Sequence, residues 1–364
     1  MTDLAILQKR YADLGLKPGQ FSACLTEDGF APPWRITAID RGWCSLLGLD
    51  EGGQETTQRV RTGDWLIAVG DWVLLSSRAQ DSVVEQVLDR ATYLRRATRG
   101  GAAQQWIAAN LDTVFVVAAF GPTEKLERRG INARRIERYI SAVHEGGAIP
   151  VVILNKLDVA GRDVEQTQAL CAELASRFGA AVVAVSAIEG GGLDVLAPYL
   201  EKGGTVAFVG PSGVGKSTLL NVLTGRADAA TSDVRATDMK GKHTTTRREL
   251  SRMPGGALLI DTPGMREFAV LLEDDVVPGF DDIEELATEC RFSDCQHESE
   301  PGCAVMEALS QGALQPDRLK SYRAIVRDGQ RASIKHDAKA RHEQRKSDKQ
   351  FARVVKSAKK FKKR

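Results

Sequence analysis

The chain has 364 residues, a formal net charge of +2 and 43% hydrophobic residues, which leaves room for two or three modules with cores of their own. The sequence contains no long apolar run and no apolar segment near its first residue, which disfavours a membrane-spanning or secreted protein. We therefore expect a cytoplasmic protein whose six cysteines are free thiols or metal ligands.

The first third of the chain predicts a small antiparallel barrel after a leader at 1–33. Turn residues separate short runs that alternate between apolar and polar side chains. The runs are Trp34–Ile39, Gln58–Arg61, Trp65–Val69, Asp71–Leu75 and Ser82–Leu88. About five strands at this spacing favour an OB-type barrel over 34–105. Such barrels stack single-stranded nucleic acid on aromatic rings, and Trp34, Trp43, Trp65 and Trp72 are available, although each one is more often a core residue.

The middle of the chain predicts a doubly wound α/β domain over 106–275. Buried strands are expected at 113–119, 151–154, 181–185, 206–209 and 258–260. Helices are expected between them, at 136–144, 165–178, 193–200 and 217–223. In such a sheet ligands bind at the carboxyl ends of the strands, so motifs in those positions are expected to share one site.

Asn155-Lys156-Leu157-Asp158 follows the second of these strands and matches a guanine-reading motif. The Asp158 carboxylate can accept hydrogen bonds from the guanine N1–H and N2–H₂ groups, a donor pair that adenine lacks. The Lys156 stem can lie along the base plane, and Asn155 can tie its loop to neighbouring backbone. After the next strand, a backbone N–H of Ser186-Ala187 is expected to meet the guanine O6.

A phosphate-binding loop follows the fourth strand. Its sequence, Gly-Pro-Ser-Gly-Val-Gly-Lys-Ser, fits G-x-x-x-x-G-K-[ST] in full. Backbone N–H groups of the loop and the helix N-terminus would surround the phosphates; Lys216 would reach the β- and γ-phosphates, and the Ser217 hydroxyl would ligate Mg²⁺. The predicted binding residues are Gly210, Pro211, Ser212, Gly213, Val214, Gly215, Lys216, Ser217 and Thr218.

Two further segments contain the residues that we expect to face the γ-phosphate. Asp261, at the end of the fifth strand, is placed to hold Mg²⁺ through water, and the Gly264 N–H could sense the γ-phosphate. Between the loop and Asp261, the stretch 241–246 offers Thr245 (or its neighbour Thr246) as a Mg²⁺ ligand and His243 as a group to orient or deprotonate water. An ordinary solvated histidine is an equally open interpretation of His243. Met265 stands where many GTPases carry a water-orienting glutamine, so intrinsic turnover is expected to be slow.

The order of these motifs is unusual, because the guanine-reading tetrad precedes the phosphate-binding loop. In an ordinary GTPase it follows. The sequence therefore predicts a circularly permuted P-loop GTPase domain in which the segment after Gly264 lies at the C-terminal border and responds to the nucleotide state.

A cysteine and histidine cluster predicts a helical zinc-binding module over 276–330. The spacing Cys290-x4-Cys295-x-His297-x5-Cys303 supplies three sulfurs and one imidazole, a tetrahedral zinc set with no open position and hence a structural role. Cys24, Cys44 and Cys171 are scattered and are expected to stay unpaired.

The charge of the chain is unevenly distributed. Residues 331–364 hold 14 lysines and arginines against 3 aspartates and glutamates, whereas the rest of the chain holds 36 against 45. Such a basic tail favours a polyanion as partner, and RNA more than a membrane surface, because Phe351 and Phe361 give only a thin apolar face.

Taken together, these motifs resemble the small ribosomal subunit biogenesis GTPase family (RsgA, also called YjeQ). The resemblance rests on the barrel, the NKLD and GPSGVGKS motifs, the GKHTTT loop, the DTPG turn followed by an apolar residue, and the C-x4-C-x-H-x5-C cluster. It implies GTP hydrolysis stimulated by the small ribosomal subunit during late maturation of that subunit. It also implies one structural zinc on Cys290, Cys295, His297 and Cys303, and contact with ribosomal RNA through the barrel and the zinc module.

The expected partners are thus the small (30S) subunit, its rRNA and GTP or GDP, with Mg²⁺ beside the nucleotide, no membrane and a monomeric state. One alternative is an RNA-binding assembly factor that uses guanine nucleotide only as a conformational ligand, which the missing glutamine favours mildly. An ATP-using kinase or ATPase is disfavoured by Asp158.

Overall fold

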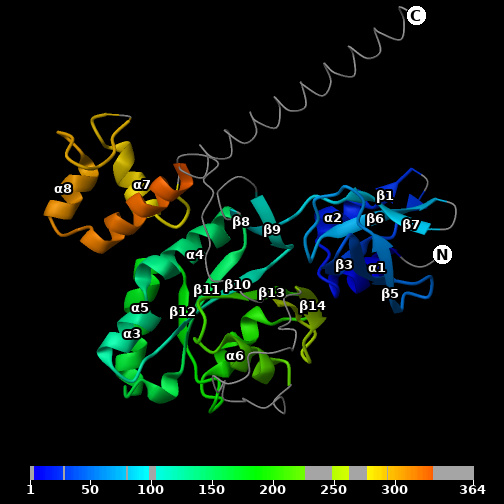
Figure 1. Ribbon diagram of the computed structural model, residues 1–364, viewed down its shortest axis with the longest axis horizontal. Coiled ribbons are helices and arrows are strands. Elements are labelled where there is room, and N and C mark those ends of the chain that lie inside the picture. The colour runs from blue at the N-terminus through cyan, green and yellow to red at the C-terminus, as the bar shows by residue number, and fades with distance from the viewer. Residues whose placement is uncertain are drawn as a thin grey trace, which may run out of the picture. The chain divides into compact units, whose positions relative to one another are not determined.

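The computed structural model (Figure 1) describes residues 4–27, 29–78, 81–97, 104–225, 248–261, 277–292 and 294–330. The chain divides into two compact units, one comprising 1–95 and 106–268 and the other comprising 96–105 and 269–364.

Residues 4–27 and 29–30 fold against the barrel. They form helices α1 (Leu4–Ala12) and α2 (Pro18–Ala23) and a hairpin of β1 (Leu25–Thr26) and β2 (Gly29–Phe30). Tyr11 and Phe21 pack in one buried cluster with Leu49, Trp72 and Leu88 of the barrel. Trp72 is fully buried there, so it is a core residue rather than a stacking platform.

Five strands make a closed barrel, as the sequence predicts. They are β3 (Trp34–Asp40), β4 (Trp43–Leu49), β5 (Glu55–Arg61), β6 (Trp72–Arg78) and β7 (Asp81–Val87). Their order is β3-β4-β5-β7-β6, and β6 pairs back with β3 to close the ring. Inward-facing side chains such as Ile36, Leu46 and Val60 form its core.

Two expectations for the barrel are corrected. The run Trp65–Val69 is not a strand: it lies in the connection before β6, where Leu66 is 78% exposed and Val69 makes a single bridge to Ala108. The fifth strand is instead β4, over Trp43–Leu49. Its side chains alternate in burial, and Cys44 and Leu46 are buried. The residues on its other face are uncharged, which makes this alternation hard to recognise in the sequence.

The α/β part carries the predicted parallel sheet. Its strands are β10 (Thr113–Ala119), β11 (Ile149–Asn155), β12 (Ala181–Ala184), β13 (Thr205–Val209) and β15 (Leu258–Asp261), in the order β12-β11-β10-β13-β15. The antiparallel strand β14 (Glu249–Arg252) follows β15 in the sheet. The helices are α3 (Glu124–Gly130), α4 (Ala133–Glu145), α5 (Val164–Phe178) and α6 (Lys216–Leu223).

The central strand β10 is buried along its whole length, as expected for a strand covered on both faces. One predicted helix is corrected: 193–199 is a 3₁₀ helix that contains Pro198, a residue without the N–H that an α-helix interior needs. The strands β8 (Tyr93–Ala97) and β9 (Gln104–Ala109) pair in the segment between the barrel and β10.

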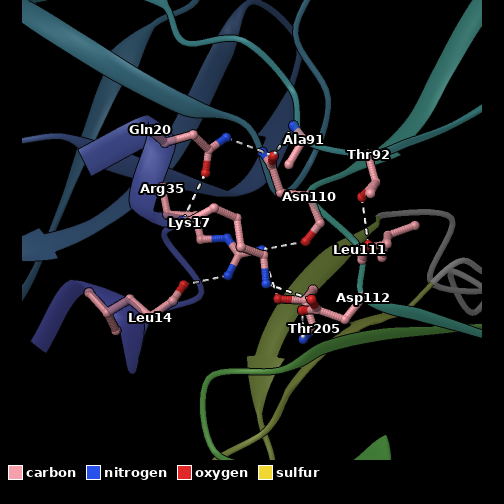
Figure 2. Close-up of polar contacts among 10 residues, drawn as sticks. All are labelled: Leu14, Lys17, Gln20, Arg35, Ala91, Thr92, Asn110, Leu111, Asp112 and Thr205. Carbon is pink, nitrogen blue, oxygen red and sulfur yellow. Dashed lines mark hydrogen bonds and ion pairs between the residues drawn. The ribbon is translucent and has the colours of Figure 1, made fainter. Parts of the chain in front are cut away.

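A buried polar network joins the N-terminal helices, the barrel and the α/β sheet (Figure 2). Arg35 of β3 is fully buried and donates to the backbone carbonyl of Leu14, to that of Asn110 at 3.3 Å and to the Thr205 hydroxyl at 2.9 Å. Burial lowers the pKa of Arg35 to about 10, and Asp112, which accepts from Lys17, partly offsets this effect. Strand pairing also joins the barrel to the α/β sheet, since β14 pairs with β3 at Glu249 and Ala38.

The second unit contains short helices around a small core. They are α7 (Asp281–Thr288), α8 (Ala304–Ser310) and helical residues at 316–330. The ring of Phe280 packs on Tyr322, and Arg318 forms an ion pair with Asp282. Within the part of the chain that the structure describes, no helix is both long and apolar enough to span a membrane.

Candidate nucleotide and metal sites

The phosphate-binding loop has the backbone that its glycines predict. It connects the buried strand β13 to helix α6, and Gly210, Gly213 and Gly215 have φ values of 143°, 83° and 91°. A Cβ on Gly210 would lie 2.3 Å from the carbonyl oxygen of Val117, and one on Gly215 would lie 2.3 Å from the side-chain amide nitrogen of Asn155. At these two positions, both space and conformation therefore require glycine.

Lys216 closes the loop. Its ammonium group donates to the carbonyls of Gly210 and Pro211, both at 2.7 Å. Burial lowers the pKa of Lys216, and the carboxylate of Asp261 counteracts that shift. Because Ser217 and Thr218 occupy the first turn of α6, their hydroxyls lie at the positive end of the helix.

The guanine-reading tetrad and the phosphate loop are in direct contact, although Asn155 and Val214 lie 59 positions apart in the sequence. Asn155 ends β11 with only 1% of its surface exposed, and its side-chain amide donates to the Val214 carbonyl at 2.9 Å. Lys156 adopts a left-handed backbone (φ 66°) and donates from its ammonium group to the Gly213 carbonyl at 2.7 Å. The sequence predicts that Asn155 ties its loop to neighbouring backbone, and the structure identifies that backbone as the phosphate loop.

Asp158 is oriented by a serine from the next strand's loop. It lies in the 3₁₀ turn Leu157–Val159, and its carboxylate accepts from the Ser186 hydroxyl at 2.6 Å. The sequence places both residues in the base pocket but gives no signal for this bond. The backbone N–H of Ser186 donates to Gly191, and that of Ala187 donates to the Asn155 side chain at 3.1 Å. A contact from either N–H to the guanine O6 therefore stays a prediction, and it would require one of these bonds to be shared.

The groups expected around Mg²⁺ are described only in part. Asp261 ends β15 and is exposed. Since β15 pairs with β13, the strand that the phosphate loop follows, Asp261 lies on the strand next to that loop. An exposed hydroxyl and a carboxylate are suitable oxygen ligands for Mg²⁺, directly or through water. His243, Thr245 and Gly264 lie outside the described residues, and their roles stay predictions.

A cavity of about 850 Å³ adjoins the phosphate loop. Its walls include Pro211–Val214 of the loop, Lys156, and three arginines of helix α4, namely Arg134, Arg135 and Arg138. Sequence reasoning did not single out these arginines. Their spacing along α4 places basic side chains near the loop, which makes this side of the pocket electropositive.

The cysteine and histidine cluster is assembled as predicted. Cys290, Cys295, His297 and Cys303 each offer one ligand atom, and these atoms lie within 4.8 Å of one another. The Nδ1 atom of His297 is 3.6 Å from the Cys290 sulfur and 3.5 Å from the Cys303 sulfur, and the two sulfurs are 3.8 Å apart. Ligands about 2.3 Å from a tetrahedral zinc are separated by roughly 3.8 Å, so this donor set fits the ion.

The loop that carries these ligands is held by groups around it. The Glu300 carboxylate accepts from the backbone N–H groups of Gln296, Glu298 and Ser299. The backbone carbonyl of His297 accepts from Arg323. Such supporting contacts fix the orientation of metal ligands.

The fold and the site define a circularly permuted GTPase of the P-loop class, with an N-terminal OB-like barrel and a C-terminal Cys/His cluster. A family model described as "RsgA GTPase" matches residues 87–271. A protein of Syntrophotalea carbinolica named "Small ribosomal subunit biogenesis GTPase RsgA" is 43% identical over 80% of this chain and 81% of its own length. A protein of the same name from Streptomyces coelicolor is 40% identical over 91% of each chain. The chain therefore belongs to the RsgA GTPase family.

Solved structures support the same fold. The crystal structure of YjeQ from Thermotoga maritima has a TM-score of 0.58, with 24% identity over 82% of this chain and 98% of that one. The structure of YloQ, described as a circularly permuted GTPase, has a TM-score of 0.56, with 22% identity over 82% of this chain and 95% of that one.

Proposed function

We propose that this protein hydrolyses GTP to GDP and phosphate, that the small ribosomal subunit stimulates this hydrolysis, and that the protein acts in late maturation of that subunit. The observation that supports the proposal is the pair of hydrogen bonds from Asn155 and Lys156 to the phosphate loop, because they join the segment expected to read guanine to the segment expected to bind phosphate. The names of the family's relatives supply the link to the small subunit.

In this proposal the residues divide the work by position. Asp158 selects guanine, while Asn155 and Lys156 keep the base pocket attached to the loop. Lys216 and the loop N–H groups bind the phosphates, and Ser217 and Asp261 would hold Mg²⁺, which supplies positive charge beside the γ-phosphate when it is bound. Thr245, His243 and Gly264 keep the γ-phosphate roles that the sequence predicts for them.

The remaining assignments follow from the family and the site. We keep the division into a leader at 1–33, a barrel at 34–105, a GTPase domain at 106–275, a zinc module at 276–330 and a basic tail at 331–364. One structural zinc would bind Cys290, Cys295, His297 and Cys303, consistent with the distances among their ligand atoms. The protein would be a cytoplasmic monomer, and its partners would be the small subunit and its rRNA.

GTP turnover titrated with purified small subunits tests the function. The wild type should accelerate about tenfold or more, as GTPases do when a partner completes the site, and Lys216→Ala should stay near background. Lys9→Ala, which changes an exposed lysine of α1, is the matched control and should behave as the wild type. A flat, negligible rate with normal GTP binding would favour the alternative, an RNA-binding assembly factor that uses the nucleotide only as a conformational ligand.

A further inference from the structure

A second cavity, of about 560 Å³, opens between helix α1 and the barrel. Its lining includes Tyr11, Phe30, Trp34 and Leu49 as apolar walls and Asp50 and Glu51 as charged groups. It shares no residue with the nucleotide motifs or the metal cluster, so neither accounts for it. Its volume lies within the usual range of ligand pockets.

The aromatic walls are fixed in place by packing. Tyr11 is 1% exposed, and its ring centroid lies 5.7 Å from that of Phe30. The ring of Trp34 covers Gly48 so closely that a Cβ there would come within 2.7 Å of it. The cavity is therefore preformed, because its rings have little freedom to collapse into it.

The charge beside these rings is negative. Asp50 and Glu51 are both exposed and directly follow strand β4. Asp50 accepts one hydrogen bond, from the Gln54 N–H at 2.8 Å, which leaves its second oxygen available. None of the described residues that line the cavity is a lysine or an arginine. Arg10 reaches the same loop, but its guanidinium donates to the carbonyls of Gly52 and Gly53.

Aromatic faces next to carboxylates are complementary to a cation on an apolar stem. The ring faces attract the positive charge, the stem removes apolar surface from water, and the carboxylates accept hydrogen bonds from the charged group. A lysine or arginine side chain has this chemistry. Because the cavity is open and larger than a single side chain requires, it also suits the residues beside that cation in a peptide.

We propose that this cavity binds a basic peptide segment of a partner protein. A lysine or arginine of that segment lies against Phe30 and Trp34, with its charged group at Asp50 and Glu51. The site is separate from the nucleotide pocket, so peptide binding and guanine-nucleotide binding are independently measurable.

The full chain, labelled with ¹⁵N at its tryptophan indoles, tests the proposal by NMR. The Trp34 signal is assigned from its loss in Trp34→Phe. The probe is the peptide acetyl-Gly-Leu-Arg-Lys-Leu-Gly-amide, and its neutral counterpart carries glutamine at both basic positions. The basic peptide should shift the Trp34 signal in a saturable way and bind about threefold to fivefold more tightly than the neutral one, the range of an exposed cation–aromatic contact.

A matched pair of variants locates the contact. Glu51→Gln should weaken binding of the basic peptide about threefold, as expected for an exposed ion pair, whereas Glu85→Gln, on the exposed part of β7, should leave it unchanged. Equal binding of both peptides, or no shift of Trp34, overturns the proposal. A shift caused by n-butyltrimethylammonium and not by the peptide also overturns it, because the occupant would then be a small ammonium compound. Fluorescent GDP binding in the same samples shows that the protein is folded and reports separately on the proposed function.

Discussion

The side chain of Asn155 bridges to Val214 in the phosphate-binding loop, donating to its carbonyl at 2.9 Å, and accepts from the N–H of Ala187 at 3.1 Å. One buried amide therefore joins the segments that follow β11, β13 and β12. The loop predicted to recognise the base and the loop predicted to bind phosphate are thus joined, because a separation of the two would break a hydrogen bond of this amide.

Removal of that amide should weaken nucleotide binding. Asn155→Ala leaves the Val214 carbonyl and the Ala187 N–H without their partner, at a cost of about 1–3 kcal/mol for each buried group. We expect the affinity for fluorescent GDP to fall by about tenfold or more, measured by titration. Asn221→Ala, on helix α6, is the control, and an equal loss there would contradict a specific role for Asn155.

Substitution of two glycines in the same loop distinguishes the effect of a steric clash from the effect of an unfavourable backbone conformation. Gly213 and Gly215 both have positive φ, but a Cβ on Gly213 meets nothing within 4 Å, whereas one on Gly215 meets the Asn155 side chain. Gly213→Ala should cost only the left-handed conformation, about 1 kcal/mol, while Gly215→Ala should nearly abolish GDP binding. Similar affinities of the two variants would show that the Asn155 contact does not limit this position.

Loss of one metal ligand should unfold the second unit selectively. Cys303→Ser removes a proposed zinc ligand whose sulfur also caps helix α8, and a module this short that binds a structural metal depends on it for folding. We expect bound zinc to fall from one ion per chain to near none, with proteolysis beginning within 277–330 and GDP binding retained. Cys171→Ser, outside the cluster, should keep its zinc; if it too lost the metal, the ligand assignment would be wrong.

The buried guanidinium of Arg35 should contribute strongly to stability. Arg35→Met leaves the Leu14 and Asn110 carbonyls without this donor, so the free energy of unfolding should fall by about 2–4 kcal/mol. Urea denaturation measures the change. Arg59→Met is the comparison, because the Arg59 side chain is 57% exposed and its loss should change stability by less than about 1 kcal/mol.

Alkaline pH should destabilise the N-terminal cluster through Tyr11. Burial raises the pKa of its hydroxyl from 10.0 to about 12, so folding favours the neutral phenol. The resulting stability is fully present below pH 10 and is lost as the pH rises towards 12. Tyr11→Phe should flatten this part of the pH profile in urea denaturation. Cys24 and Cys44, whose pKa values burial raises to about 11, titrate in the same range and leave a residual slope in the variant.

Much of this fold follows from sequence because its strands are strongly patterned. The fully buried β10 was predicted at its exact bounds, 113–119, since a continuous apolar run has few alternatives. The run at 65–69 misled because Trp65 and Leu66 are apolar yet partly exposed. For the candidate site, the sequence predicts that Asn155 binds neighbouring backbone but does not identify that backbone. The Ser186–Asp158 bond and the arginines of α4 depend on how distant segments pack, which no local pattern encodes.

Strand β14 has a consequence for the way a chemical event can reach the barrel. In the sequence it lies between Thr245 and Gly264, which are predicted to face the γ-phosphate. In the sheet it lies between β15 and β3. A sliding movement of β14 along its axis would break bonds at both of its edges at once. If Thr245 and Gly264 have the γ-phosphate roles that the sequence predicts, their movement on phosphate release would act on β14 from both ends and reach the barrel through its pairing with β3 at Glu249 and Ala38.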